Sequence, residues 1–263
     1  LFLIRNAILN LPPLIVVDAI PNTDGLIPLR AAASDLKVRI PALPQPGPAA
    51  ARCRIMVFIE SPPPGEYQVV AYRQYPTYPT GDLIVEVPRR MVGNEGEYRL
   101  TYIVDDGDNV LRATDSTPLK VQKTPPFGYL RFTPREPMLP ANLTTALITE
   151  EYLANNDPVW FRIPEHAEYN DLVALRCIPF YGTTDRHMEW SYSEPPTILL
   201  SDIPANRRFA LPAATIRELG NGSKQLKYRL IDQADNRARD SFILEVMVAL
   251  RITPSNIAIP RVP

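Results

Sequence analysis

The sequence predicts an all-β protein: two tandem β-sandwiches, each of roughly seven strands with at most a short helical turn. Proline is the first observation, because its 30 residues are about 11% of the 263, roughly double ordinary usage, and disfavour long helices. The second is apolar–polar alternation, with turn signals every ~8–12 residues. The third is an internal repeat, which predicts two copies of one fold.

The repeat joins segments about 123 to 126 positions apart. DLKVRIP at 35–41 corresponds to PVWFRIP at 158–164, and further matches follow in the same order. Each copy spans about 120–125 residues, an ordinary size for one domain. The repeat pairs Tyr102 with Tyr228, Asp106 with Asp232, Asn109 with Asn236, and Cys53 with Cys177.

The repeat also sets the expected domain boundaries. LRFTP at 130–134 opens the second copy, and LRITP at 250–254 follows that copy at the equivalent place. Because the sequence also opens on Leu1, we expect a processed or excised piece of a longer tandem array. The expected parts are an apolar strand or linker at 1–13, sandwiches at 14–124 and 125–249, and a linker or first strand of a following module at 250–263.

Individual elements follow from local patterns. YRLTYIV at 98–104 and LKYRLID at 226–232 alternate apolar and polar residues, which predicts half-buried strands. RIMVFIE at 54–60 is nearly all apolar, which predicts a central strand covered on both sides. PAATIRELG at 212–220, with its counterpart at 88–96, predicts a short helical connection between two late strands.

An acidic cluster follows the first of these alternating strands. Asp105, Asp106 and Asp108 stand beside Asn109 and could bind Ca²⁺ through their carboxylates. Asp-Gly and Asp-Asn sequences also favour hairpin turns, and the spacing is not that of an EF-hand. The turn is the favoured interpretation, and we expect no cofactor.

A row of tyrosines is the best binding candidate. Tyr72, Tyr75 and Tyr78 stand three apart in a proline-rich stretch, and polyproline II spacing would place them on one side. Trp190 and Tyr192 occupy the corresponding stretch of the second copy. Such a row could stack on surface glycans or a host protein. Packing of a proline-rich edge segment is the favoured alternative.

The cysteines and histidines indicate neither a metal site nor a catalytic site. Cys53 and Cys177 fall in different copies, so we expect two unpaired, strand-borne thiols that behave as small hydrophobic residues. His166 and His187 lack nearby thiols for a zinc site, and the first copy has no histidine. We therefore expect no enzyme.

Charge and hydropathy exclude two classes of partner. The formal net charge of −1 argues against nucleic-acid binding by the whole chain. The apolar opening at 1–10 is too short to span a bilayer, and no other run reaches ~18 apolar residues. We expect neither nucleic-acid binding nor membrane insertion.

The repeated pattern resembles the tandem bacterial immunoglobulin-like repeats of large surface-exposed or secreted proteins, of pseudomonad type. The residues that carry it are a strand ending in Ile-Pro, then Tyr228 to Asp232, Asn236, and Ser241 to Val246. The first copy departs by losing one residue in the turn, and 46–51 lack an aspartate that Asp171 supplies in the second. The resemblance implies a seven-strand sandwich, an extracellular or cell-surface location, and no activity.

We therefore expect a non-enzymatic structural or adhesive segment that acts as a semi-rigid spacer, because the linker KTPPFGY at 123–129 is short and proline-stiffened. Its expected partners are neighbouring modules of the same chain and, through the terminal strands, other copies. Three alternatives stay open: a polymerising subunit that donates its N-terminal strand, a carbohydrate-binding module that uses Tyr72 to Tyr78, and an accessory domain of a toxin or phage-tail protein.

Overall fold

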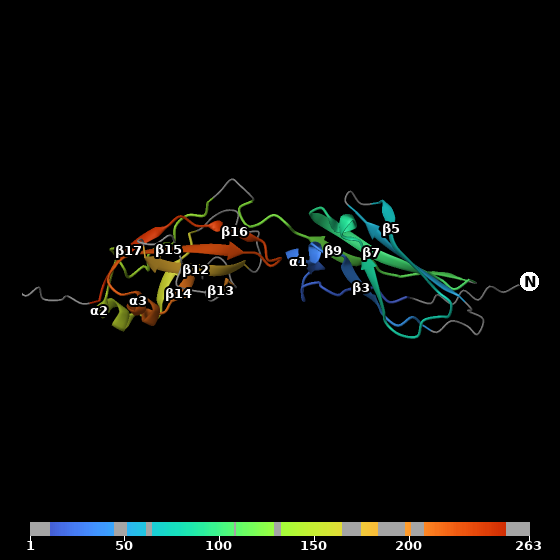
Figure 1. The fold of residues 1–263 in the computed structure, drawn as a ribbon, viewed down its shortest axis with the longest axis horizontal. Helices are drawn as coiled ribbons and strands as arrows, with labels where there is room; N and C mark the ends of the chain where they lie inside the picture. The colour runs from blue at the N-terminus through green and yellow to red at the C-terminus, as the bar shows by residue number, and fades with distance from the viewer. Residues whose placement is uncertain are drawn as a thin grey trace, which may run out of the picture. The chain divides into compact units, whose positions relative to one another are not determined.

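The chain forms two compact units, Leu1–Thr124 (unit 1) and Pro125–Pro263 (unit 2), each with its own hydrophobic core. Both are immunoglobulin-like β-sandwiches, as the sequence predicts, and Figure 1 shows the strands of each. The computed structural model describes residues 11–44, 52–61, 65–107, 109–128, 133–164, 175–183, 198–200 and 208–250.

Unit 1 packs a three-stranded sheet against a larger one. Its elements are β1 (Ile15–Val16), β2 (Leu26–Ile27), α1 (Leu29–Ala32), β3 (Leu36–Ile40), β4 (Cys53–Glu60), β5 (Tyr67–Tyr75), β6 (Leu83–Val87), the 3-10 helix η1 (Arg89–Val92), β7 (Gly96–Asp105), β8 (Val110–Arg112) and β9 (Thr117–Val121). The small sheet has the order β1-β3-β6. The large sheet has the order β2-β9-β7-β4-β5, with β8 beside β7.

Unit 2 repeats this plan, except that an isolated bridge takes the place of β1 among its described residues. Its elements are β10 (Leu147–Thr149), α2 (Glu150–Asn155), β11 (Val159–Arg162), β12 (Leu175–Thr183), β13 (Ile198–Leu200), β14 (Arg208–Leu211), α3 (Ala213–Leu219), β15 (Gly222–Ile231), β16 (Arg237–Asp240) and β17 (Leu244–Ala249). The large sheet has the order β10-β17-β15-β12-β13, with β16 beside β15, and β11 pairs with β14. The bridge from Met138 to Arg162 stands where Ile15 pairs with Arg39 in unit 1.

The first strand of each large sheet runs parallel to the last. Ile27 pairs with Val121 in unit 1, and Ile148 pairs with Val248 in unit 2. Gly25 makes the first of these pairings possible, because it has φ +72° and a Cβ there would lie 2.0 Å from the Pro118 carbonyl oxygen. In each unit, the first strand of the large sheet is therefore held by the last, and we call these two its closing strands.

The cysteines occupy equivalent strands but not equivalent positions. Both are buried free thiols, as expected. Val104 and Leu230 each follow the repeated tyrosine by two residues, yet Val104 faces Ile55 and Leu230 faces Cys177. Cys177 therefore corresponds to Ile55, and the sequence match with Cys53 is two residues out of register. Burial raises the pKa of Cys53 to about 11 and raises that of Cys177 as well.

The described residues form four short helices, of which η1 and α3 were predicted. The other two, α1 and α2, have only four and six residues and were not. A local signal for α2 exists, because Thr149 caps it by accepting a hydrogen bond from the Tyr152 N–H at 3.1 Å. Glu150 and Glu151 in its first turn face the positive end of the helix dipole.

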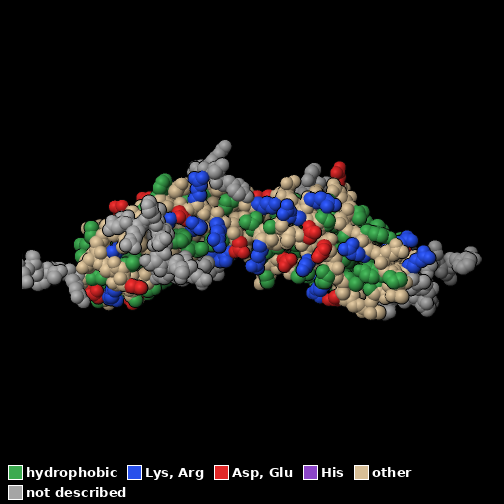
Figure 2. Space-filling model, viewed as in Figure 1, with side chains coloured by type: hydrophobic (Ala, Val, Ile, Leu, Met, Phe, Trp, Pro, Cys, Tyr) green, Lys and Arg blue, Asp and Glu red, His purple; other side chains and the backbone are tan. Residues whose placement is uncertain are grey.

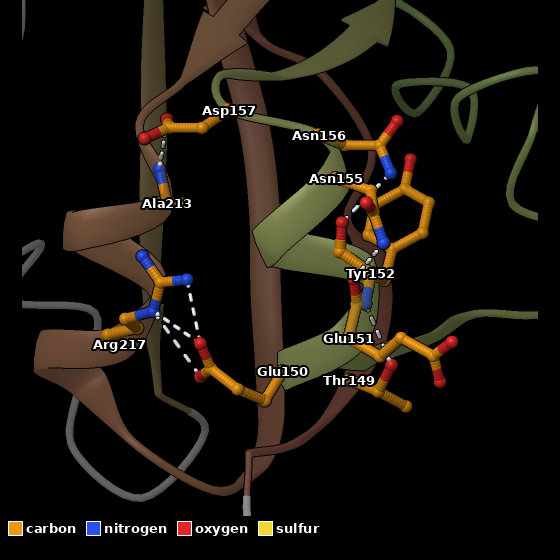
Figure 3. A network of polar contacts seen from close by, with 9 residues as sticks. All are labelled: Thr149, Glu150, Glu151, Tyr152, Asn155, Asn156, Asp157, Ala213 and Arg217. Carbon is orange, nitrogen blue, oxygen red and sulfur yellow. Dashed lines mark hydrogen bonds and ion pairs between the residues drawn. The ribbon is translucent and has the colours of Figure 1, made fainter.

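Polar contacts join α2 to α3 in unit 2 (Figure 3). The Arg217 side chain donates to Glu150 at 2.7 Å and forms an exposed ion pair, a kind that contributes little to stability. The Ala213 N–H donates to Asp157 at 3.0 Å, which satisfies an N–H that the first turn of α3 leaves unpaired. In unit 1 the Arg89 N–H donates to Asp35 at 2.9 Å. An aspartate just before β3 or β11 thus holds the helical connection in both units.

Within the described residues, none of the helices has the length and apolar character needed to cross a membrane.

Unit 2 should fold on its own, because its strands and core come from residues 125–263. The isolated segment is expected to give a β-type circular dichroism spectrum and one cooperative thermal transition. A random-coil spectrum would contradict the division into two units.

Candidate functional site

The repeated tyrosines are buried core anchors. The Tyr102 hydroxyl donates to the Pro12 carbonyl at 2.8 Å, which ties the segment before β1 to the central strand β7. Burial raises its pKa. Tyr228 is equally buried, and its N–H donates to the Ser241 hydroxyl at 3.0 Å. Both tyrosines therefore serve the fold rather than a ligand.

The repeated Asp and Asn residues close equivalent hairpins. In unit 1 the Asn109 N–H donates to the Asp106 carboxylate at 2.7 Å. In unit 2 the Asn236 N–H and side-chain amide donate to Asp232, both at 2.8 Å. The unit 2 turn holds one more residue, and Asp235 there adopts φ +68°. These bonds indicate a structural role for the repeated pair.

The described carboxylates of the acidic cluster bind groups of the hairpin and of the neighbouring strand β4. Asp105 forms an ion pair with Arg54 at 3.3 Å and accepts the Gly107 N–H at 2.9 Å. Asp106 is 7% exposed, and Asp108 lies outside the described residues. Across the described ranges, no three His, Cys, Asp or Glu side chains cluster closely enough to hold a metal ion.

The predicted tyrosine row does not form. Tyr72 and Tyr75 lie on strand β5, where residues three apart point to opposite faces, so polyproline II spacing does not apply. Tyr75 and Tyr78 pack against the unit 1 core, and burial raises the pKa of Tyr78. Tyr72 alone of the three points outward. Trp190 and Tyr192 lie outside the described residues.

Tyr72 belongs instead to a broad surface on the large sheet of unit 1. Cross-strand pairing places the outward side chains of β4, β5, β7 and β8 together, and we call them the outer face of unit 1. A β-bulge at Val70 switches the outward positions of β5 from odd to even numbers. The outer face comprises Arg54, Met56, Phe58, Glu60, Tyr67, Val69, Tyr72, Gln74, Arg99, Thr101, Ile103, Asp105, Val110 and Arg112.

The outer face is apolar and open to solvent along its edge strand, β5, while Met56, Phe58 and Ile103 beside it are half-buried. Tyr67, Val69 and Tyr72 are 45%, 55% and 47% exposed, although all three are large apolar side chains on one strand. The Arg112 guanidinium lies 5.5 Å from the centre of the Tyr67 ring, a cation–π contact. Exposed tyrosine, arginine and aliphatic groups together are typical of protein interfaces.

Charged residues border these apolar positions. At one end a groove of about 740 Å³ is lined by Glu60, Arg99, Glu97 and Lys120 among others, and the last two form an ion pair at 3.4 Å. At the other end stand Arg54 and Asp105. Figure 2 likewise shows basic and acidic side chains interspersed with hydrophobic ones on the visible side of unit 1.

On the described strands of the equivalent surface of unit 2, side chains of the same chain cover the central aromatic ring. Phe180 corresponds to Phe58, and Lys227 and Arg229 each lie 5.4 Å from its ring centre. Both cations also bind the Asp240 carboxylate, Arg229 at 2.7 Å. The two units thus share a scaffold but differ on this face.

Sequence reasoning missed the outer face. The apolar strand at 54–60 predicts burial on both sides, yet Met56 and Phe58 lie on the solvent side and are only half-buried. A signal was present, because apolar residues occupy outward positions on three neighbouring strands. Cross-strand register was needed to bring those positions together.

Comparison with known proteins gives only distant likenesses. No family model matches the chain, and no curated protein does. Among solved structures, the FN1–FN3 domains of chicken CNTN1 match at 6% identity and TM-score 0.44, over 86% of this chain and 62% of that chain. This chain therefore spans less than two thirds of the CNTN1 structure.

Two further likenesses involve bacterial proteins. The fibronectin(III)-like modules of Clostridium thermocellum CbhA match at 10% identity and TM-score 0.39, over 90% of this chain and 94% of that chain. A 1.5-MDa bacterial ice-binding adhesin matches at 12% identity and TM-score 0.39, over 92% and 67%. None of these likenesses says what this chain binds.

Asp106→Ala should destabilise unit 1 by about 1–2 kcal/mol, because the hairpin loses a partly buried acceptor. Urea unfolding by circular dichroism, with Ca²⁺ or with a chelator, should show the same loss. Both tryptophans, Trp160 and Trp190, fall in unit 2, so the fluorescence transition is an internal control that should not move. Stabilisation of the wild type alone by Ca²⁺ would favour a metal site.

The stability of unit 2 should depend on the protonation of Asp232. Burial raises the pKa of this carboxyl, although hydrogen bonds from Asn236 and Ala234 and the charge of Arg176 partly oppose the shift. A raised folded-state pKa favours the protonated form, so this stabilisation is present below the unfolded pKa of about 3.9 and is lost as pH rises through the folded pKa.

Tryptophan fluorescence in denaturant at several pH values measures this effect. The free energy of unfolding of the wild type, minus that of Asp232→Asn, should fall as pH rises above the unfolded pKa of about 3.9. The Asn variant cannot titrate at this position, so contributions of other groups cancel in the difference. A difference that rises with pH would contradict the raised pKa of Asp232 in the folded state.

Proposed function

We propose that this chain is a non-enzymatic tandem segment of a larger extracellular or cell-surface bacterial protein. It acts as a semi-rigid spacer, and the outer face of unit 1 is its adhesive surface. The observation that carries this proposal is the repetition of one complete sandwich, each copy with its own core and its own parallel closing strands. The pseudomonad type rests on the sequence resemblance alone.

The closing strands suit a segment under tension. In unit 1 the Lys120 N–H donates to the Gly25 carbonyl at 2.9 Å, and in unit 2 the Met247 N–H donates to the Ala146 carbonyl at 2.7 Å. Because these strands are parallel, a force along them loads their hydrogen bonds together in shear. The interior strands are protected until this pairing fails.

The start of the linker is fixed to unit 1. Glu95 accepts hydrogen bonds from the N–H and hydroxyl of Thr124, at 2.9 and 2.6 Å. The Lys123 ammonium donates to the Gly93 carbonyl. Pro125 and Pro126 follow directly and restrict the backbone. These contacts favour a stiff connection over a flexible one.

Single-molecule stretching of the whole chain tests the spacer role. We expect two separate unfolding events, each releasing about 400 Å of chain, since about 120 residues extend by up to ~3.6 Å each. Lys120→Pro should weaken one event and Met247→Pro the other, because each removes one closing N–H. Circular dichroism checks that both variants fold.

Two results would contradict the proposal. One is a single event that releases both units together. The other is folded proline variants that leave both unfolding forces unchanged.

A further inference from the structure

We propose that the outer face of unit 1 binds the same face of a second copy of this chain. The inference rests on the proposed adhesive function and names its partner. An apolar patch with three side chains 45% to 55% exposed is a surface that association would cover. What points to a second copy is the arrangement of charge around that patch.

The four charged corners of the outer face alternate in sign. Strand β4 carries Arg54 at one end and Glu60 at the other. Strand β7 carries Asp105 opposite Arg54 and Arg99 opposite Glu60. Each corner thus has the opposite charge to its neighbour along the strand and to its neighbour across the sheet.

A two-fold axis midway between two facing copies, parallel to their sheets and perpendicular to the strands, makes this pattern complementary to itself. It lays β4 antiparallel over β4 of the second copy, so that Arg54 meets Glu60 of the other copy, and Glu60 meets its Arg54. In the same way Asp105 on β7 meets Arg99 of the other copy. The interface is isologous, so each charge contact occurs twice.

The same axis brings the apolar residues together at the centre. Met56 lies over Phe58 of the second copy, and Tyr72 lies over its Val69. An apolar centre inside a charged rim is the usual anatomy of a specific protein interface. With this axis, the charges set the register of β4 on β4 of the second copy.

Unit 2 lacks this self-complementarity. The same operation on its large sheet places Lys227 over Arg229 of a second copy, which brings like charges together. Unit 2 is therefore a matched internal control with the same fold and an unsuitable face.

Analytical ultracentrifugation of the full chain, from about 10 μM to 1 mM, tests the proposal in the range of weak transient interfaces. We expect a monomer–dimer equilibrium that Tyr72→Arg weakens at least about tenfold. Met247→Arg is the control, because Met247 is 49% exposed on the large sheet of unit 2 and should leave the equilibrium unchanged.

A pair of charge reversals tests the geometry. Arg54→Glu alone and Glu60→Arg alone should each abolish self-association, because each places like charges together twice. An equimolar mixture of the two variants should associate again, since every contact of β4 with β4 then joins opposite charges. Thermal melting of each variant confirms that it is folded.

Several results would overturn the proposal. The first is a wild type that stays monomeric. The second is an equal loss of dimer affinity in Tyr72→Arg and Met247→Arg. The third is an equimolar mixture of Arg54→Glu and Glu60→Arg that does not associate. A monomer whose unit 1 binds oligosaccharides on a glycan array, with loss on Tyr72→Arg, would assign the face to carbohydrate instead. None of these results changes the stretching experiment, so the spacer role and the self-association are tested separately.

Discussion

The register between the two central strands of each large sheet decides which of their side chains enter the core and which are exposed. Because side chains alternate along a strand, the pairing of β4 with β7 decides at once which residues enter the core and which face solvent. A shift by one residue would bury Arg54 and expose Ile55. The buried tyrosine, the hairpin aspartate and the charged corners of the outer face all depend on this one alignment.

The sequence was informative wherever structure is local or repeated. Alternation predicted the strands that contain Tyr102 and Tyr228, and a proline followed by a short apolar segment and a glycine predicted α3. Asp106 and Asn109 were correctly recognised as a hairpin turn. Each of these features is determined by residues within one element or one turn.

Features that depend on contacts between strands were not predictable in this way. The bulge at Val70 exists only relative to β4, and it decides that Tyr67, Val69 and Tyr72 share a face. The mismatch of Cys53 and Cys177 is also a matter of pairing, since short similar triplets can align two residues away from their structural counterparts. The outer face was not predicted for the same reason. Its residues carry no local signal, and only the pairing of neighbouring strands places them on one surface.

The parallel pairing of β2 with β9, and of β10 with β17, has a consequence for how such a protein can evolve. Because these two strands run in the same direction, the chain enters the sandwich at one end and leaves it at the opposite end. A module of this kind can be duplicated or deleted as a whole, and the chain still leaves in the direction in which it entered. Reach then becomes a matter of gene copy number, while single substitutions on an exposed face can give one copy a new binding role without disturbing its siblings.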